Sequence, residues 1–470
     1  MDLEQRAHRQ NLRVIISETI MVIAVALMVV ILVLIVSGYW LNSDFKVERQ
    51  GMLQISSVPT GASVAVDGDT SWFQRTNTSK ILSSGEHEII LTKDGYDSWS
   101  KAVNISEGLL YKLNYPHLFL EERVRESVYD VATAAFATVS PNRKLLLLAN
   151  NTTLWSLINL DSDTIKSTEL NLSAVLSASS SQDPSDNQSS SSTTTPILFN
   201  GTIISAEWDS ANEHVLLEIS LDSKTEWLLI DIRNVAKSVN LTRKFTQDFS
   251  SIRIFDNSAS TLLALVNSDL YKIDVDGLQI SPVLASGINS YDFYDSEIVL
   301  ASKDSVSLLK NFAATPSEIT TVDSLAQVLF GRFYENKYIF IITGGTIAIY
   351  NKDDLIENQS YQINFTPATA KVGPEGEFIF MSEGSHFATL DMEAQKVVEW
   401  SIDTTHFGWL NGHMLYAIDG GVLSVYDFDG LNHRTLASNV SERFPVTITN
   451  DKWLYYFSDG QLIREWLVAK

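Results

Sequence analysis

The feature that most constrains the fold of this chain is a strand pattern that recurs about every 40 residues through its last three quarters. Each unit holds an apolar strand, a short polar turn and a second apolar strand that commonly ends in Asp or Asn. The second strand returns at intervals of 73, 43, 36, 41, 40, 36 and 39 residues. Its eight occurrences are Leu154–Asn159, Trp227–Asp231, Leu270–Asp274, Val306–Leu309, Ile347–Tyr350, Phe387–Asp391, Leu423–Asp427 and Leu462–Glu465.

A period of about 40 residues with short strands is typical of a β-propeller, in which each unit is one four-stranded blade. Residues 125–470 are therefore predicted to form a propeller. The long first interval contains a run of Ser, Asp, Gln and Thr at 173–196. This composition cannot bury apolar surface, which predicts a disordered insertion between the first two units. The intervals indicate eight blades, and seven blades with a split closing strand is the alternative.

Near the N-terminus, eighteen uncharged and mostly apolar residues run from Thr19 to Val36. A helix of that length covers about 27 Å, which matches the hydrocarbon core of a bilayer. Tyr39-Trp40-Leu41 follows, and such aromatic side chains are common at membrane interfaces. The sequence therefore predicts one transmembrane signal-anchor helix at residues 14–41, with the lipid bilayer as its partner. A cleaved signal peptide is the alternative.

Positive charge predicts the orientation of this anchor. Arg6, Arg9 and Arg13 come shortly before the apolar run. The positive-inside rule therefore leaves residues 1–13 as a cytoplasmic tail and exports the rest of the chain. We expect a single-pass protein of the cell membrane with its bulk outside the cytoplasm.

Between the anchor and the repeats, residues 51–115 alternate apolar and polar positions between Gly, Pro and Asp turns. Clear examples are Ala62–Val66, Gly85–Leu91 and Trp99–Ile105. Period-two patterning of this kind predicts a small β-sandwich. Tyr96 and Trp99 are expected in its core.

Three landmarks stand out in this region: Ile55–Gly68, Gly85–Ile89 and Lys93–Tyr96. Together they resemble the PEGA domain, a family found in prokaryotic envelope proteins. The resemblance implies a β-sandwich of the cell envelope. Thr60 stands where the Glu of the family's Pro-Glu-Gly-Ala turn is expected.

A second departure from the PEGA pattern is a long segment at residues 69–80, which we expect to be a loop. It carries Trp72 and Phe73, two large apolar side chains in a polar context. Exposed aromatic side chains are common at binding surfaces. Trp72 and Phe73 are therefore the candidate partner contacts.

The repeats resemble WD40-like and TolB-like propellers. Ser140–Leu145 and Gly373–Ile379 look like the turn that precedes the second strand of a blade. Tyr426–Leu436 looks like the strand-end turn of the TolB-like type. The Trp-Asp pair of true WD repeats occurs once, at Trp208-Asp209, so intracellular WD40 proteins are a poor match.

Composition narrows the range of partners. The formal net charge of −23 argues against nucleic acid, whose phosphates would be repelled. The chain contains no cysteine, which excludes disulfides, thiol catalysis and thiolate metal sites. This acidity keeps an exported protein soluble and favours cations or basic partners.

Catalytic and metal motifs are missing from the sequence. There is no Gly-x-Ser-x-Gly elbow, no His-Glu-x-x-His pattern and no phosphate-binding loop; Gly344-Gly345 reads as a hairpin turn. His87 and His413 are expected in turns with structural roles. The two Asp-x-Asp-Gly segments, Asp274–Gly277 and Asp427–Gly430, fit Asx turns better than Ca²⁺ loops. We therefore predict no catalytic, cofactor-binding or metal-binding residue.

These observations predict an all-β exported region, made of a PEGA-like sandwich and a propeller and preceded by one transmembrane helix. The expected function is non-catalytic recognition in the cell envelope, with the propeller face binding a protein or a glycan. An envelope scaffold or spacer, and a propeller enzyme acting on glycans, are the alternatives.

Overall fold

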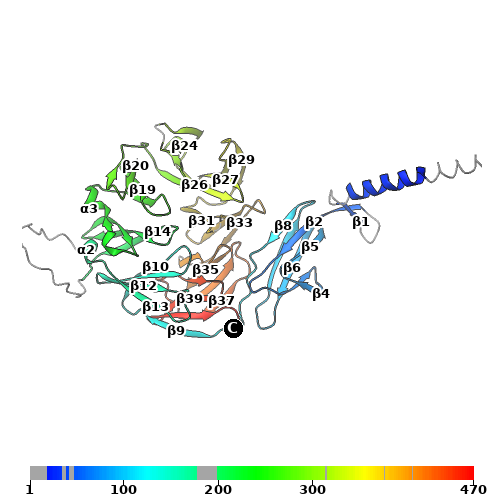
Figure 1. The fold of residues 1–470 in the computed structure, drawn as a ribbon, viewed down its shortest axis with the longest axis horizontal. Coiled ribbons are helices and arrows are strands. Elements are labelled where there is room, and N and C mark those ends of the chain that lie inside the picture. Colours follow the sequence, from blue (N-terminus) through cyan, green and yellow to red (C-terminus); the bar gives the residue numbers. More distant parts are fainter. Residues whose placement is uncertain are drawn as a thin grey trace, which may run out of the picture. The chain divides into compact units, whose positions relative to one another are not determined.

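The computed structural model describes residues 18–33, 39–41, 47–176, 198–312, 315–374, 376–404 and 406–469. The chain divides into two compact units, Met1–Glu121 and Glu122–Lys470. β-Strands make up most of the regular structure in both (Figure 1). The predicted cytoplasmic tail lies outside the described residues.

Residues 18–33 form a helix whose apolar side chains are exposed, among them Ile20, Leu27 and Val33. No helix within the described ranges is long and apolar enough to span a bilayer. The structure therefore does not bear out the predicted transmembrane helix in the part of residues 14–41 that it describes.

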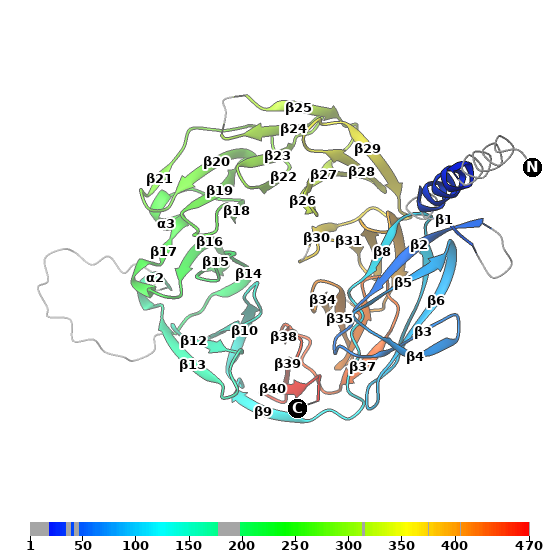
Figure 2. The same cartoon turned by 45° about the vertical axis from the view of Figure 1, so that its right-hand side comes forward.

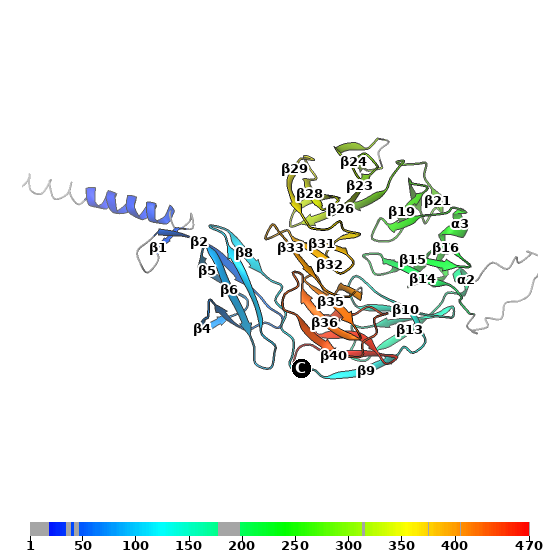
Figure 3. The same ribbon diagram turned by 180° about the vertical axis from the view of Figure 1, so that it is seen from behind.

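Two four-stranded sheets form the sandwich of the first unit (Figures 1 and 3). The strands are β1 Tyr39–Leu41, β2 Val47–Ile55, β3 Ser63–Val66, β4 Asp69–Arg75, β5 Thr78–Ser83, β6 Gly85–Thr92, β7 Trp99–Ile105 and β8 Leu110–Leu113. In one sheet β2 pairs with β1 and β5 in antiparallel fashion and with β8 in parallel, and the other has the order β4-β3-β6-β7.

The expected loop at 69–80 is wrong, because most of these residues belong to strands. β4 forms a hairpin with β3, and β5 then crosses to the other sheet. Trp72 and Phe73 belong to β4, and the structure does not describe their side chains. Their role as partner contacts stays a prediction.

The sandwich core follows the period-two pattern of its strands. Trp99 is fully buried and Tyr96 is nearly so, which confirms that both belong to the core. His87 lies within β6 and not in a turn as expected. Its Nδ1 bonds to Asp67 Oδ2 at 2.7 Å and its Nε2 contacts the Ser83 carbonyl at 2.8 Å, a structural role.

The second unit is a β-propeller of eight four-stranded antiparallel sheets arranged around an axis (Figure 2). Sheets succeed one another in chain order, as the repeat predicts. Blades 1 to 4 are β10 Ala134–Val139, β11 Leu145–Asn150, β12 Leu154–Asn159 and β13 Lys166–Asn171; β14 Thr202–Trp208, β15 His214–Leu221, β16 Lys224–Asp231 and β17 Val239–Asn240; β18 Ser251–Ile254, β19 Thr261–Val266, β20 Asp269–Asp274 and β21 Gln279–Ile280; β22 Ser290–Tyr294, β23 Glu297–Ala301, β24 Ser305–Lys310 and β25 Ser317–Thr321.

Blades 5 to 8 continue the same order. They are β26 Ala326–Phe333, β27 Asn336–Thr343, β28 Thr346–Asn351 and β29 Glu357–Gln362; β30 Thr369–Val372, β31 Phe378–Glu383, β32 His386–Asp391 and β33 Lys396–Ser401; β34 His406–Trp409, β35 Met414–Asp419, β36 Val422–Asp427 and β37 Arg434–Ala437; β38 Thr447–Thr449, β39 Trp453–Ser458, β40 Gln461–Trp466 and β9 Arg125–Asp130. The last blade therefore takes its outer strand from the start of the unit, where β9 pairs with β40.

The recurring strand of the sequence is the third strand of every blade, β12, β16, β20, β24, β28, β32, β36 and β40. Eight blades and a split closing strand therefore occur together. Residues 173–176 of the predicted insertion form a short helix, α2 Ser173–Leu176, in which Val175 and Leu176 are buried. These four residues were wrongly expected to be disordered, and residues 177–196 lie outside the described part.

Apolar side chains fill the space between successive blades. Between blades 2 and 3 the buried cluster includes Leu216, Leu229, Leu262 and Ile273. Because each blade contributes one face to the cluster, blades 2 and 3 hold each other in a fixed position.

An ion-pair network joins the innermost strands of three successive blades. Arg253 of β18 lies 2.7 Å from Asp292 of β22 and 3.8 Å from Glu207 of β14. Asp292 also accepts the amide N–H of Phe330 in β26 at 2.7 Å. The ion pairs connect blades 2, 3 and 4 near the propeller axis, and the hydrogen bond to Phe330 adds blade 5.

Candidate functional site

The turn between the first and second strands is capped in the same way in several blades. A polar side chain at the end of the first strand accepts a backbone N–H at the start of the second. Ser140 accepts the amide of Leu145 at 3.0 Å, Asp209 that of His214 at 3.0 Å, and Asp256 that of Ser260 at 2.9 Å. The predicted turn at Ser140–Leu145 is thus confirmed, and its hydrogen bond explains the motif.

The Asp or Asn that ends the third strand also has a structural role. Asp231 Oδ1 accepts the amides of Arg233 and Asn234 at 2.9 and 2.8 Å. Asp274 Oδ1 likewise accepts the amide of Gly277, three residues on, at 2.9 Å, so it caps the turn that follows the strand. In the described ranges no three His, Asp or Glu side chains are grouped as a metal site.

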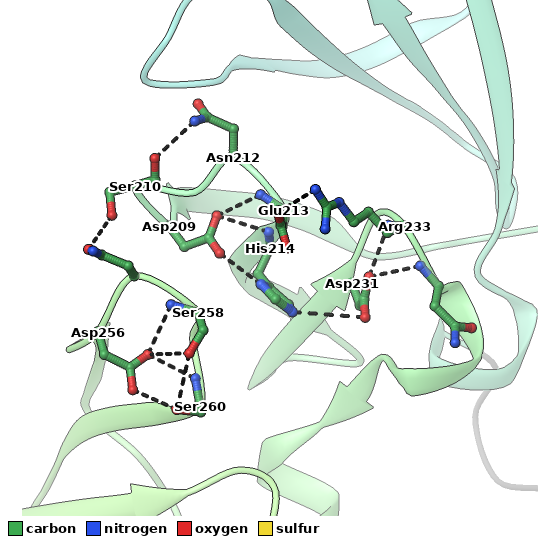
Figure 4. Close-up of polar contacts among 12 residues, drawn as sticks. Asp209, Ser210, Asn212, Glu213, His214, Asp231, Arg233, Asp256, Ser258 and Ser260 are labelled. Carbon is green, nitrogen blue, oxygen red and sulfur yellow. Dashed lines mark hydrogen bonds and ion pairs between the residues drawn. The ribbon is translucent and has the colours of Figure 1, made fainter.

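Blade 2 adds a histidine to this common frame (Figure 4). His214 is the first residue of β15, and in the strand register it lies directly opposite Asp231 at the end of β16. Its Nδ1 is 2.7 Å from Asp209 Oδ2, and its Nε2 is 3.9 Å from Asp231 Oδ2. Asp209 is fully buried and can only accept, so His214 donates from Nδ1.

A pocket of about 380 Å³ opens at this place between blades 2 and 3. Blade 2 contributes His214, Asp231 and residues of the segment that follows β16. Blade 3 contributes the turn between β18 and β19 and the residues after β20. The lining is Glu213, His214, Leu229, Asp231, Arg233, Asn234, Lys237, Ser258, Ala259, Ser260, Val275 and Asp276.

Charges of both signs surround the pocket. Glu213 and Arg233 form an ion pair at 2.5 Å, so they neutralise each other. Lys237 and Asp276 are both exposed. Few apolar side chains line the pocket, and a polar ligand therefore fits it better than an apolar one.

The geometry does not form a Ser-His-Asp triad, although all three residue types are present. Ser260 Oγ donates to Asp256 Oδ2 at 2.6 Å, and Ser258 Oγ contacts Asp256 Oδ1 at 3.3 Å. Both hydroxyls are thereby directed to a carboxylate of their own turn and away from His214 (Figure 4). Nucleophilic catalysis needs the hydroxyl to bond to the histidine.

Sequence analysis did not single out His214 or Asp231 as site residues. A comparison of equivalent positions in the repeated strands could have identified His214. When the blades are aligned by their strand register, the residue opposite the terminal Asp is Thr261 in blade 3 and Met414 in blade 7. His214 departs from that pattern, and this departure was detectable in the sequence.

Other expectations from the sequence are placed by the structure as follows. Gly344-Gly345 connects β27 to β28, and Gly344 has a φ of 55° as the predicted hairpin requires. His413 lies in the turn before β35, where its ring contacts Phe378 and its Nδ1 is 3.5 Å from Glu377. Both belong to the scaffold and not to the pocket.

Residues 50–117 match the model of the PEGA domain family. None of the curated proteins matches the chain in sequence. Among solved structures, the C-terminal WD40 domain of Sif2 is similar with a TM-score of 0.48 and 9% identity, over 74% of this chain and 99% of that one. Kluyveromyces lactis Hsv2 is similar with a TM-score of 0.43 and 7% identity, over 65% of this chain and 98% of that one. The chain thus carries a PEGA domain at residues 50–117, as its sequence motifs predict, followed by an eight-bladed propeller.

Proposed function

We propose that this protein is a non-catalytic recognition protein of the cell envelope. Its propeller binds a protein or glycan partner through the pocket between blades 2 and 3. Residues 14–41 attach it to the membrane with the N-terminus in the cytoplasm and the bulk of the chain outside. The PEGA domain separates the propeller from the membrane along the chain.

The observation that carries the binding role is the convergence of His214 and Asp231 in a polar pocket. The cap formed by Asp209 fixes the imidazole, and the Asx turn fixes the carboxylate of Asp231. Both groups are thus preorganised, with side chains only 19% and 14% exposed. Preorganised polar groups bind a ligand without a large entropic cost.

Affinity capture tests this role. Full-length protein in detergent is used as bait for membrane extracts, with three forms side by side: wild type, Asp231→Asn and Asp274→Asn. Asn at either position keeps an Oδ1 that can accept the turn amides, so both variants are expected to fold. The Asp231→Asn bait should lose the partner, while Asp274→Asn, at the equivalent place in blade 3, should retain it. Equal capture by all three would refute the pocket as the binding site.

Membrane attachment rests on the uncharged run from Thr19 to Val36 and on the exposed apolar side chains of helix 18–33. The arginines before this run support the proposed orientation. Alkaline carbonate extraction should leave the full chain in the membrane pellet, and protease added outside should digest the propeller. Release by carbonate would refute the anchor and would leave the pocket proposal intact.

A further inference from the structure

We propose that the pocket between blades 2 and 3 recognises a primary ammonium group, held by Nε2 of His214 and Oδ2 of Asp231. This inference rests on the proposed binding role and names the chemistry of the ligand. A small free amine and the lysine side chain of a partner protein are two sources of the same group.

The two acceptor atoms are placed for a single donor. Because His214 donates from Nδ1 to Asp209, its Nε2 carries the lone pair in the neutral imidazole. Nε2 and Asp231 Oδ2 are 3.9 Å apart, which is too far for a direct hydrogen bond. For a donor atom placed about 2.8 Å from each acceptor, the angle acceptor–donor–acceptor would be about 90°. An ammonium nitrogen, with three N–H groups, can donate to both at once.

The fold itself does not require this acceptor pair. In blade 3 the cap residue Asp256 satisfies its second oxygen with the hydroxyl of Ser260, at 2.6 Å. There the residue at the position of His214 is Thr261, and in blade 1 it is Leu145. The turn is therefore built equally well without an imidazole. The backbone hydrogen bonds of the turns account for Asp209 and for Asp231 Oδ1, and they do not involve the Nε2 edge of His214 that faces the pocket.

The surrounding charges favour a cation of modest size. The nearest guanidinium, Arg233, is paired with Glu213 at 2.5 Å. Asp276 adds a carboxylate from blade 3, and the net charge of the whole chain is −23. Lys237 is the lining residue that opposes an ammonium group. A negative pocket in a negative protein raises the local concentration of cations.

Other ligand classes fit less well. A metal ion at ordinary bond lengths of about 2.1 Å would need further ligands, and the described residues supply no third one to this pair. An anion would meet two acceptors. An apolar ligand would desolvate His214 and Asp231 without replacing their hydrogen bonds.

Calorimetric titration of the full-length protein with n-butylammonium tests the proposal. Two control probes keep the butyl chain and each remove one property of the ammonium group: n-butyltrimethylammonium keeps the charge but has no N–H groups, and n-butanol keeps one donor but has no charge. We expect binding of n-butylammonium, with both controls at least about tenfold weaker. A tripeptide with a central lysine, capped at both ends, compares the second source. Tighter binding of the peptide than of the free amine indicates a protein partner, and equal or tighter binding of the amine indicates a small ligand.

Matched variants locate the binding. Asp231→Asn and His214→Asn should each weaken n-butylammonium binding at least about tenfold, because Asn at 214 still offers an N–H for Asp209 but lacks Nε2. Asp274→Asn should bind as the wild type does, and Lys237→Gln should bind more tightly. Equal affinity for n-butylammonium and n-butyltrimethylammonium, or an unaffected Asp231→Asn variant, would overturn the proposal. If the captured partner still depends on Asp231 while no amine binds, the ammonium assignment fails and the proposed function stands; if neither depends on it, both fail.

Discussion

A buried ion pair lies beside β9, the strand that closes the propeller ring by pairing with β40. Arg123, just before β9, donates to Glu465 of β40 at 2.5 Å and to the carbonyl of Leu436 at 2.9 Å. Glu465 also accepts a hydrogen bond from the hydroxyl of Tyr456 at 3.0 Å. Burial is the largest cause that raises the pKa of Tyr456, and the negative charge of Glu465 raises this pKa further. The side chains of Arg123 and Glu465 are only 14% and 5% exposed. Removing one partner therefore leaves the other charged in a site with little water.

We predict that Arg123→Met lowers the free energy of unfolding by about 3–5 kcal/mol, the usual cost of an uncompensated buried charge. The propeller unit spans Glu122–Lys470. At about 2.1 cal/mol/K per residue its unfolding entropy is about 0.7 kcal/mol/K, so the midpoint should fall by about 4–7 °C. Thermal unfolding of full-length wild type and variant, followed by calorimetry, measures this shift. Lys371→Met, which removes an exposed positive charge, serves as the control and should shift the midpoint by less than about 1 °C.

The double variant Arg123→Met/Glu465→Gln provides the second half of the test. A glutamine amide is neutral and its oxygen still accepts the hydroxyl of Tyr456, so the buried charge is removed and this hydrogen bond is kept. The double variant should recover at least half of the lost stability. A single variant that shifts the midpoint by less than about 2 °C would refute the reasoning. So would a double variant no more stable than the single one, because the loss would then come from packing and not from charge.

Three further predictions concern stability elsewhere in the propeller. Burial raises the pKa of Glu207, although the nearby charge of Arg253 acts in the opposite direction. Ionised Glu207 therefore lowers the free energy of unfolding at neutral pH. This loss disappears as the pH falls through the raised pKa and the carboxylate becomes protonated. Glu207→Gln should therefore raise the free energy of unfolding at pH 7 in urea titrations, with the gain disappearing in acid; a loss at pH 7 would show that the ion pair outweighs burial. Phe387 is fully buried and lies 4.8 Å from the ring of Trp400, so Phe387→Ala should cost about 3–5 kcal/mol in the same titration. Gly430 has a φ of +78°, and a Cβ there would approach Trp400 to 2.8 Å, so Gly430→Ala should destabilise by more than about 1 kcal/mol, and a neutral result would contradict the tight contact.

The fold of the propeller was predictable because its signal is repeated. A single strand such as Leu270–Asp274 is ambiguous, but eight of them at regular intervals leave few other architectures. The terminal Asp that helped to mark the strands proved to be the Asx cap of the turn that follows, as Asp274 shows. The sequence therefore contained the reason for its own pattern.

Sequence reasoning failed where a segment had no repeat to support it. Residues 69–80 are mostly polar apart from Trp72 and Phe73, and a loop was expected there. Strand pairing decides the outcome: β4 forms a hairpin with β3, which directly precedes it, and β5 pairs with β2, which lies well before it in the sequence and leaves no local signal in this segment. His87 was misplaced for the same reason. Its neighbour Asp67 is 20 residues away in the sequence, and only the pairing of β3 with β6 brings the two together.

Departures from the repeat are the positions where function can be sought, and blade 4 shows how to distinguish them. There the residue opposite the end of the third strand is Glu297, and its partner is Lys310 at 3.9 Å. Lys352 also approaches Glu297, at 3.0 Å, so this carboxylate forms ion pairs with two lysines of the protein itself. In blade 2 the corresponding pair is His214 and Asp231, which both present acceptors when the imidazole is neutral, and these acceptors lie 3.9 Å apart. A departure that the protein satisfies internally is part of its stability. One that places two acceptors together beside a pocket offers them to a donor from outside, which is why the blade 2 pair and not the blade 4 pair is proposed as the binding site.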